Sequence, residues 1–162
     1  MSDQVLRDHV LALLRGGSAY MTFDDAVANF PEAFINARPP NALYTFWHLL
    51  EHVRIAQWDI LEYARNPKHV SPEWPVGYWP APETQADAAA WQESVRRFKA
   101  DRQAMEALVA DPNTDLFTPI PHGYDGHTIL REALLVADHN AYHIGELAAF
   151  RQIAGAWPKD RQ

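Results

Sequence analysis

The last helix predicted from the sequence reads TILREALLVADHNAYHIGELAAFRQIA and spans residues 128–154. Thr128 suits the capping position at its start, and apolar residues recur along one face at helical spacing. His139 and His143 lie in that apolar stripe, four residues apart. This spacing stacks two side chains on one helix face, with Cβ atoms roughly 5–6 Å apart, so both imidazoles can reach one ion. Without an ion, each imidazole would need a carbonyl or carboxylate partner from a neighbouring helix.

A second pair of histidines lies in the helix predicted from about Asn41 to Arg65. His48 and His52 are again four residues apart, and either could give the ion a third ligand. An ion that keeps positions for water and substrate needs only three protein ligands. We choose His52, because it lies deeper inside the helix, and expect His48 near the site or exposed.

Asp59 lies two turns beyond His52 on the same predicted helix. It is expected either to orient an imidazole or to pair with Arg54 or Arg131. Four further histidines lie outside the two pairs and are predicted to be surface or loop residues: His9, His69, His122 and His127.

The rest of the chain predicts an all-α four-helix bundle that forms one domain over residues 1–162. Apolar residues at helical spacing predict two more long helices, from about Ser2 to Arg15 and from about Glu83 to Ala110. A brief helix is expected to end near Asn29. No segment alternates convincingly between apolar and polar residues, so strands are not expected.

Residues 66–82, between the second and third long helices, combine several prolines with Trp74, Tyr78 and Trp79. This composition indicates an ordered loop that buries its rings, because flexible linkers are polar. The three aromatic residues either line or roof a pocket beside the ion, or they cap the hydrophobic core or a dimer contact.

The composition excludes several functional classes. The chain has no cysteine, so it has no disulfide, no cysteine-based zinc site and no thiol nucleophile. Its net charge of −7, with dispersed basic residues, argues against nucleic-acid binding. It contains neither a run of about 18 apolar residues nor the features of a signal peptide, so we expect a cytoplasmic protein without a membrane partner.

Two segments and the Trp/Pro loop together resemble the DinB-like superfamily of metalloenzymes. The segments are TFWHLLEHVR, residues 45–54, and ADHNAYHIGEL, residues 137–147. The resemblance covers most of the chain, and its most specific part is one histidine in the second helix followed by His-x3-His-x-Gly in the fourth. It implies a bundle with up-down-down-up connectivity, frequently a homodimer, and a divalent ion held at one end by His52, His139 and His143. A dimer could use the third-helix face of Trp91, Val95 and Phe98, which suits a core equally well.

The resemblance implies thiol-dependent S-transferases that use a low-molecular-weight thiol in some members, and hydrolases or isomerases in others. Three imidazoles suit zinc, nickel, copper and iron. Such an ion with an open face can generate hydroxide or thiolate near neutral pH, or polarise a carbonyl. Glu146 could be a fourth ligand or a general base, and Tyr142 could donate a hydrogen bond to a developing oxyanion. We therefore expect a metal-dependent transferase or hydrolase with a small-molecule substrate and a divalent zinc, nickel or iron ion.

The alternative class is a non-catalytic bundle, either a small-molecule binder or a stress-associated protein, with a structural metal or none. A structural zinc site usually closes with four protein ligands, as this one would if His48 joined the other three histidines. A di-iron carboxylate bundle is excluded, because the chain contains no Glu-x-x-His sequence. The zincin motif His-Glu-x-x-His is absent as well.

Overall fold

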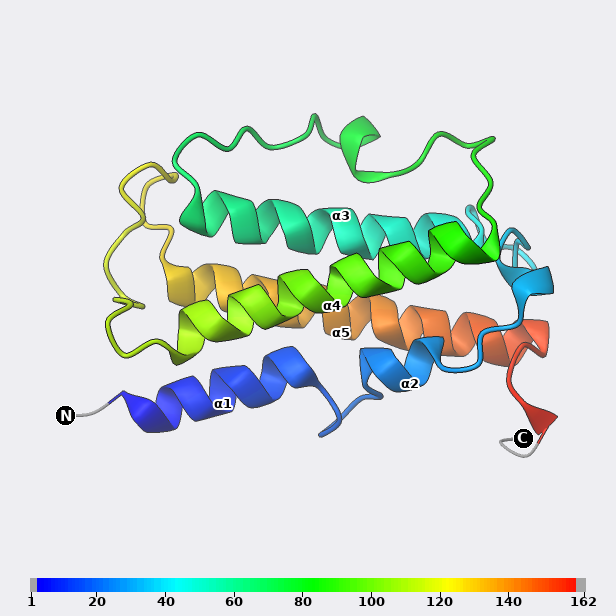
Figure 1. Ribbon diagram of the computed structural model, residues 1–162, viewed down its shortest axis with the longest axis horizontal. Helices are drawn as coiled ribbons and strands as arrows, with labels where there is room; N and C mark the ends of the chain where they lie inside the picture. The colour runs from blue at the N-terminus through cyan, green and yellow to red at the C-terminus, as the bar shows by residue number, and fades with distance from the viewer. Residues whose placement is uncertain (1–2, 160–162) are drawn as a thin grey trace.

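The chain folds into helices joined by loops, as shown by a computed structural model that describes residues 3–159 (Figure 1). The α-helices are α1 (Gln4–Arg15), α2 (Phe23–Val27), α3 (Phe46–Arg65), α4 (Ala88–Ala110) and α5 (Ile129–Ala154). Short 3-10 helices cover Glu32–Phe34 and Val76–Tyr78. Within residues 3–159 there is no strand, only an isolated bridge between Pro119 and Thr128. The prediction of an all-α fold is therefore confirmed.

Capping residues decide where the long helices begin. The side chain of Thr45 accepts a hydrogen bond from the backbone N–H three residues later, at 3.2 Å, and that of Asp87 does the same at 2.8 Å. α3 and α4 therefore begin after these caps, later than the predicted starts near Asn41 and Glu83. Asn41 has a φ of 64°, which no residue of a right-handed helix adopts. The start predicted for the first helix, at Ser2, lies outside the described residues.

α2 closes one end of the bundle against α5. It ends before the predicted Asn29, because that residue has a φ of 48°, in the left-handed region. Arg151 of α5 is 0% exposed and donates hydrogen bonds to the carbonyl oxygens of Ala26 and Ala28, at 2.7 and 3.0 Å. These bonds satisfy carbonyl groups that the end of α2 leaves free, and they hold α2 in place.

The four longest helices lie side by side (Figure 1). α3 and α1 each pack against both α4 and α5. In the figure, α1 and α5 run in one direction, and α3 and α4 run in the other. Because α3 and α4 are consecutive but point the same way, the chain between them has to return along the bundle. Residues 66–87 do so on the outer side of α3.

Apolar side chains from these helices form two clusters in the core. One brings together residues of α2, α3, α4 and α5, and the other brings together residues of α1, α3, α4 and α5. Trp91 is 1% exposed and lies in the first cluster with Val95 and Phe98. The face of α4 that suited either a core or a dimer contact therefore belongs to the core of this chain.

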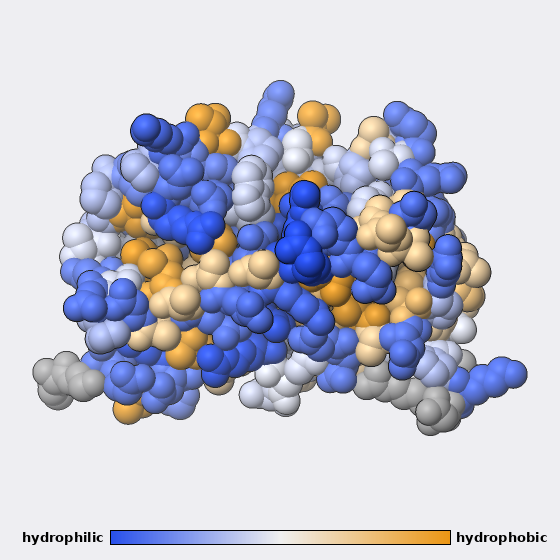
Figure 2. Space-filling view, in the orientation of Figure 1, coloured by the Kyte–Doolittle hydropathy of each residue, from blue (hydrophilic) through white to orange (hydrophobic). Residues whose placement is uncertain are grey.

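The surface is mainly hydrophilic on the face shown in Figure 2, with hydrophobic residues scattered over it. The loop of residues 66–87 contributes several of the exposed hydrophobic residues: Val70, Trp74 and Val76 are 84%, 70% and 75% exposed. The expectation that this loop buries all its rings is thus wrong for Trp74. Among the described helices, none is long and apolar enough to cross a membrane.

Candidate metal centre

Three histidines come together between α3 and α5. His52 lies on α3, and His139 and His143 lie one turn apart on α5. Each offers one ring nitrogen, and the three nitrogens lie within 4.8 Å of one another. The Nε2 atoms of His52 and His139 are 3.3 Å apart. Two nitrogens bound at about 2.0–2.1 Å to a tetrahedral ion stand about 3.3–3.4 Å apart, so this pair has the spacing of two ligands of one ion.

The loop of residues 66–87 holds His52 from two sides. The Nδ1–H group of His52 donates a hydrogen bond to the carbonyl oxygen of Tyr78, at 3.0 Å. A carbonyl can only accept, so Nδ1 carries the proton and Nε2 keeps its lone pair. The indole of Trp79 stacks on the same imidazole, with ring centroids 3.9 Å apart and planes at 3°. Burial lowers the pKa of His52, which favours the neutral ring that a metal ligand requires.

Asp59 of α3 connects this loop to the helix through two hydrogen bonds. The Tyr78 hydroxyl donates to one carboxylate oxygen of Asp59 at 2.6 Å, and Nε2 of His69 donates to the other at 2.7 Å. His69, which was predicted to be a surface or loop residue, is in the loop but its side chain is only 8% exposed. Because Tyr78 bonds Asp59 through its hydroxyl and His52 through its carbonyl, Asp59 indirectly fixes the group that orients His52.

The alternative partners suggested for Asp59 are engaged elsewhere. Arg54 pairs with Glu51 at 2.8 Å, one turn away on α3. Arg131 pairs with Glu132 at 2.6 Å, at the start of α5. Asp59 therefore orients an imidazole, as one of the two expectations had it, but the imidazole is that of His69.

Glu146 holds His143. The Nδ1–H group of His143 donates to Oε2 of Glu146 at 2.8 Å, which leaves Nε2 for an ion. The Tyr44 hydroxyl donates to Oε1. Burial raises the pKa of Glu146, but these two hydrogen bonds outweigh burial and hold the pKa below its usual value, so the carboxylate is ionised. A carboxylate on the outer nitrogen of a histidine ligand fixes the ring and increases its basicity.

His139 is the candidate ligand whose ring the protein fixes least. Its Nδ1 atom is buried and has no hydrogen-bond partner among the residues that the structure describes. Burial, followed by the nearby His143 and His52, lowers the pKa of His139 to about 3, so its ring is neutral at ordinary pH. An unpartnered, neutral imidazole beside two others fits a bound cation better than a hydrogen-bonded core. This donor set fits a divalent transition-metal ion.

His48 does not belong to the three-histidine cluster, and it is buried rather than exposed. Its Nδ1 atom bonds with the Thr45 hydroxyl, and its Nε2–H group donates to the carbonyl oxygen of Ala81 at 3.0 Å. Both ring nitrogens are therefore engaged within the protein. The arrangement therefore offers an ion three histidine nitrogens, one fewer than the four protein ligands of a closed structural site.

The remaining residues singled out in the sequence take different places. Tyr142 is 71% exposed, and its ring meets that of His143 edge-on, with centroids 4.8 Å apart. Trp79 contacts His52, Tyr78 reaches Asp59, and Trp74 points largely to solvent. Tyr44 was missed, because a lone tyrosine before a helix carries no signal that it will meet a glutamate of the last helix.

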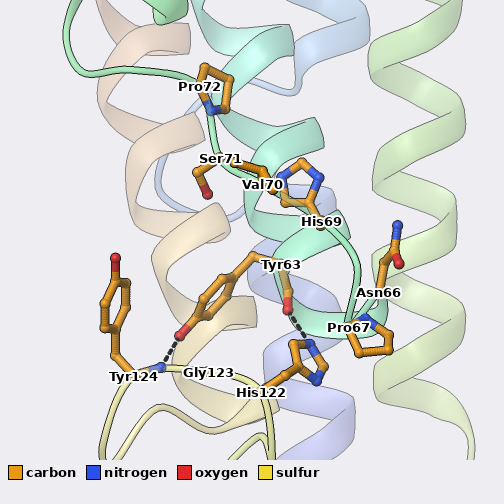
Figure 3. Close-up of a pocket in the computed structure, with 10 residues that line it drawn as sticks. All are labelled: Tyr63, Asn66, Pro67, His69, Val70, Ser71, Pro72, His122, Gly123 and Tyr124. Atoms are coloured by element: carbon orange, nitrogen blue, oxygen red, sulfur yellow. Dashed lines mark hydrogen bonds between the residues drawn. The ribbon is translucent and has the colours of Figure 1, made fainter.

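A cavity of about 510 Å³ lies away from the three histidines, at the C-terminal end of α3 (Figure 3). Its polar groups bond largely to one another. Nε2 of His122 donates to the carbonyl oxygen of Tyr63 at 2.9 Å, and the Tyr124 N–H donates to the Tyr63 hydroxyl at 2.6 Å. These bonds attach the loop before α5 to α3. His122 and His127 lie in that loop, and His9 is exposed on α1, as predicted.

The comparisons with known proteins identify one family. The sequence model of a family described as the DinB superfamily matches residues 6–147, a segment that includes all three histidines and Glu146. No curated protein and no solved structure matches the chain.

Proposed function

The chain belongs to the DinB superfamily, and from this premise we propose that it is a metal-dependent enzyme acting on a small molecule. The observation that carries the proposal is the cluster of His52, His139 and His143, whose ligand nitrogens lie within 4.8 Å of one another. With His48 engaged elsewhere, an ion would keep at least one position for water or substrate. We propose zinc, nickel or iron, since three imidazoles suit each of them.

Thiol-dependent S-transfer or hydrolysis is the reaction class that we propose. When bound, such an ion lowers the pKa of a coordinated water or thiol, or polarises a carbonyl. Because the chain contains no cysteine, a sulfur nucleophile would have to come from a second substrate, a low-molecular-weight thiol. The chain's own residues would then hold the ligands, orient the substrate and move protons.

Glu146 is our candidate for the general base, and Tyr142 for a hydrogen-bond donor to a developing oxyanion. The hydrogen bonds that lower the pKa of Glu146 keep its carboxylate ionised and able to accept a proton. One oxygen accepts from His143 and the other from the Tyr44 hydroxyl, so proton transfer to Oε1 would require the bond from Tyr44 to open. Since Oε2 accepts the hydrogen bond that orients His143, an orienting carboxylate that also moves protons is our preference over a fourth ligand.

We also propose that the bundle has the up-down-down-up connectivity of its family and that it forms a homodimer. The helix directions in Figure 1 support the connectivity. Exposed apolar residues on α5, such as Leu134 at 41% and Leu135 at 37%, support a contact between two copies. Sedimentation velocity of the wild type and of Leu135→Glu tests the dimer: the wild type should sediment as a dimer and the variant as a monomer.

Elemental analysis of untagged protein tests the metal site first, because an affinity tag can carry nickel itself. We expect near-stoichiometric zinc, nickel or iron in the wild type, and loss of that metal in His52→Ala and His139→Ala. His48→Ala and His122→Ala are the matched controls and should keep the metal. Circular dichroism shows whether each variant retains its helices. Wild-type protein that is free of metal and resists reloading would favour the alternative, a non-catalytic bundle.

Turnover is the second test. Metal-loaded protein is mixed with a small thiol and an electrophile, or with simple esters, and product is measured against the metal-free protein and the His139→Ala variant. Product that depends on the loaded metal supports an enzyme. A loaded protein that neither binds thiols nor turns over any such substrate would point instead to a structural metal in a binding protein.

A further inference from the structure

A small pocket lies beside two residues that position the histidines of the candidate metal centre. Its volume is about 200 Å³, and its walls include Leu43, Tyr44, Trp79, Pro80 and Pro82. Two of these residues also support the histidines: Trp79 stacks on His52, and Tyr44 bonds the glutamate that holds His143. A molecule in this pocket would therefore touch the groups that position two of the three ligands.

Arg38 is the charged residue of the pocket wall. In the part of the chain that the structure describes, it makes no hydrogen bond or ion pair, whereas every other arginine there bonds a carboxylate or a carbonyl. This is notable in a chain with 21 acidic and 14 basic residues, where carboxylates outnumber cations. The exposed guanidinium of Arg38 is thus free to bind a partner from outside the chain.

Two other polar side chains of the pocket wall, those of His48 and Tyr44, are engaged within the protein. Both ring nitrogens of His48, which also lines the pocket, bond to Thr45 and to the carbonyl of Ala81. The Tyr44 hydroxyl donates to a glutamate. Apart from the indole N–H of Trp79, the side chains of the remaining wall are apolar, and Leu43 on it is 86% exposed. The pocket therefore offers one free cation beside an apolar surface.

We propose that this pocket binds a small carboxylate with an apolar body about the size of one ring. An apolar cavity of about 150 Å³ holds benzene, so about 200 Å³ leaves room for one ring and its substituent. The planar guanidinium of Arg38 matches a carboxylate with two parallel hydrogen bonds. Leu43, Trp79 and the prolines contact the body. That this carboxylate is the substrate of the metal centre rests on the proposed function, whereas its binding does not require the ion.

Two ligands of the same shape test the charge requirement. We would titrate 3-phenylpropionate and the uncharged 3-phenylpropionamide into untagged protein, with and without zinc, and measure binding by calorimetry and ligand-observed NMR. The carboxylate should bind about tenfold more tightly than the amide, as expected for one charge-assisted pair at a partly exposed site. In zinc-free protein the same preference should appear, because Arg38 does not belong to the ligand set.

Variants then assign the binding to this pocket. Arg38→Gln should abolish the preference for the carboxylate, and Arg38→Lys should keep part of it. Lys68→Gln, which removes an exposed cation lining neither this pocket nor the metal centre, is the matched control and should keep the preference. Leu43→Asp places a like charge on the wall and should weaken the carboxylate more than the amide. Arg38 and Leu43 are exposed, so these changes should leave the fold intact, which circular dichroism checks.

Several results would overturn the proposal. They are equal affinity for the two ligands, no binding of either at millimolar concentration, or an unchanged preference in Arg38→Gln. A wild-type dimer that Leu43→Asp dissociates would show that a second copy covers this face, and would overturn it too. Carboxylate binding by a protein that never loads metal would support the pocket while contradicting the proposed function, so the two failures are distinguishable.

Discussion

The indole ring of Trp79 lies parallel to the imidazole of His52, with centroids 3.9 Å apart and planes at 3°. The two residues come from different parts of the fold: His52 is in the first half of α3, and Trp79 is in the loop that returns along the outer side of that helix (Figure 1). The residue beside Trp79, Tyr78, accepts the hydrogen bond of the same imidazole. The loop is therefore part of the candidate metal centre, although it supplies none of the three histidines.

Replacing Trp79 by alanine should weaken metal binding about three- to tenfold, because a stacked ring pair contributes about 0.5–1.5 kcal/mol. Competition with a chromophoric chelator measures the affinity. The melting temperature of the metal-free protein should change less than that of the loaded protein. Trp74→Ala is the control, since Trp74 is 70% exposed and does not touch the histidines. A lower melting temperature with unchanged metal affinity would mean that Trp79 serves only the core.

Asp59→Asn should lower metal affinity by about tenfold without removing a ligand, because outer partners of histidine ligands typically contribute 10–100-fold. The substitution replaces one acceptor oxygen by an NH2 donor. The new side chain can therefore no longer accept hydrogen bonds from both Tyr78 and His69. The visible spectrum of the cobalt-loaded protein should shift as His52 loses its fixed orientation. Tyr124→Phe is a suitable control, and identical affinities and spectra in Asp59→Asn and wild type would contradict the prediction.

The Glu146→Gln variant distinguishes two roles of Glu146, which are orienting His143 and accepting a proton during turnover. Glutamine can still accept from His143, so metal affinity should fall only about tenfold, through the lost charge. Turnover at full metal occupancy should fall by about a hundredfold or more if Glu146 is the base. Tyr44→Phe removes one bond to the carboxylate and should leave turnover largely intact. Equal turnover of Glu146→Gln and wild type, at matched occupancy, would remove Glu146 from the mechanism.

A buried pair of side-chain amides beside the candidate metal centre should contribute to the stability of the fold. Gln57 is 0% exposed, donates to the carbonyl of Phe98 at 2.7 Å and accepts from Asn140 at 2.8 Å. Gln57→Leu leaves the buried Asn140 amide without its acceptor. It should therefore lower the free energy of unfolding, measured by urea titration, by roughly 1–3 kcal/mol. In the double variant Gln57→Leu with Asn140→Leu, part of this loss should be regained. Strict additivity of the two single changes would contradict the coupling.

The ion pair between α2 and α4 predicts a pH-dependent stability. Burial raises the pKa of Asp24, but Lys99 and Arg102 outweigh burial and hold this pKa below its usual 3.8. Because the folded-state pKa is lowered, the stabilisation is present above pH 3.8 and is lost as the pH falls through the lower, folded-state value. Asp24→Asn should therefore melt up to about 2–4 °C lower at pH 7, a surface-pair effect of about 1 kcal/mol or less.

The difference in melting temperature between Asp24→Asn and wild type should become smaller in acid. It should also become smaller in 1 M salt, which screens exposed charges. Melting curves at several pH values, each at low and high salt, measure it. A difference that stays constant between pH 7 and pH 3 would show that Asp24 acts through something other than its charge.

Local patterns in the sequence determined the helices and the histidine pair of the last helix. Helical spacing of apolar residues reflects contacts within a few residues, so α1, α3, α4 and α5 could be predicted, with errors only at their ends. The ends depend on single caps such as Thr45 and Asp87, which local composition specifies poorly. His139 and His143 share a face because four residues make about one turn.

Only the tertiary structure decided which residues complete the site. His48 and His52 have the same local spacing, and no periodicity distinguishes them. The choice depends on where the return loop passes: it brings the carbonyl of Ala81 to His48, and that of Tyr78 with the ring of Trp79 to His52. These contacts join residues far apart in the sequence, so they depend on helix direction and loop path, which spacing along one helix does not encode.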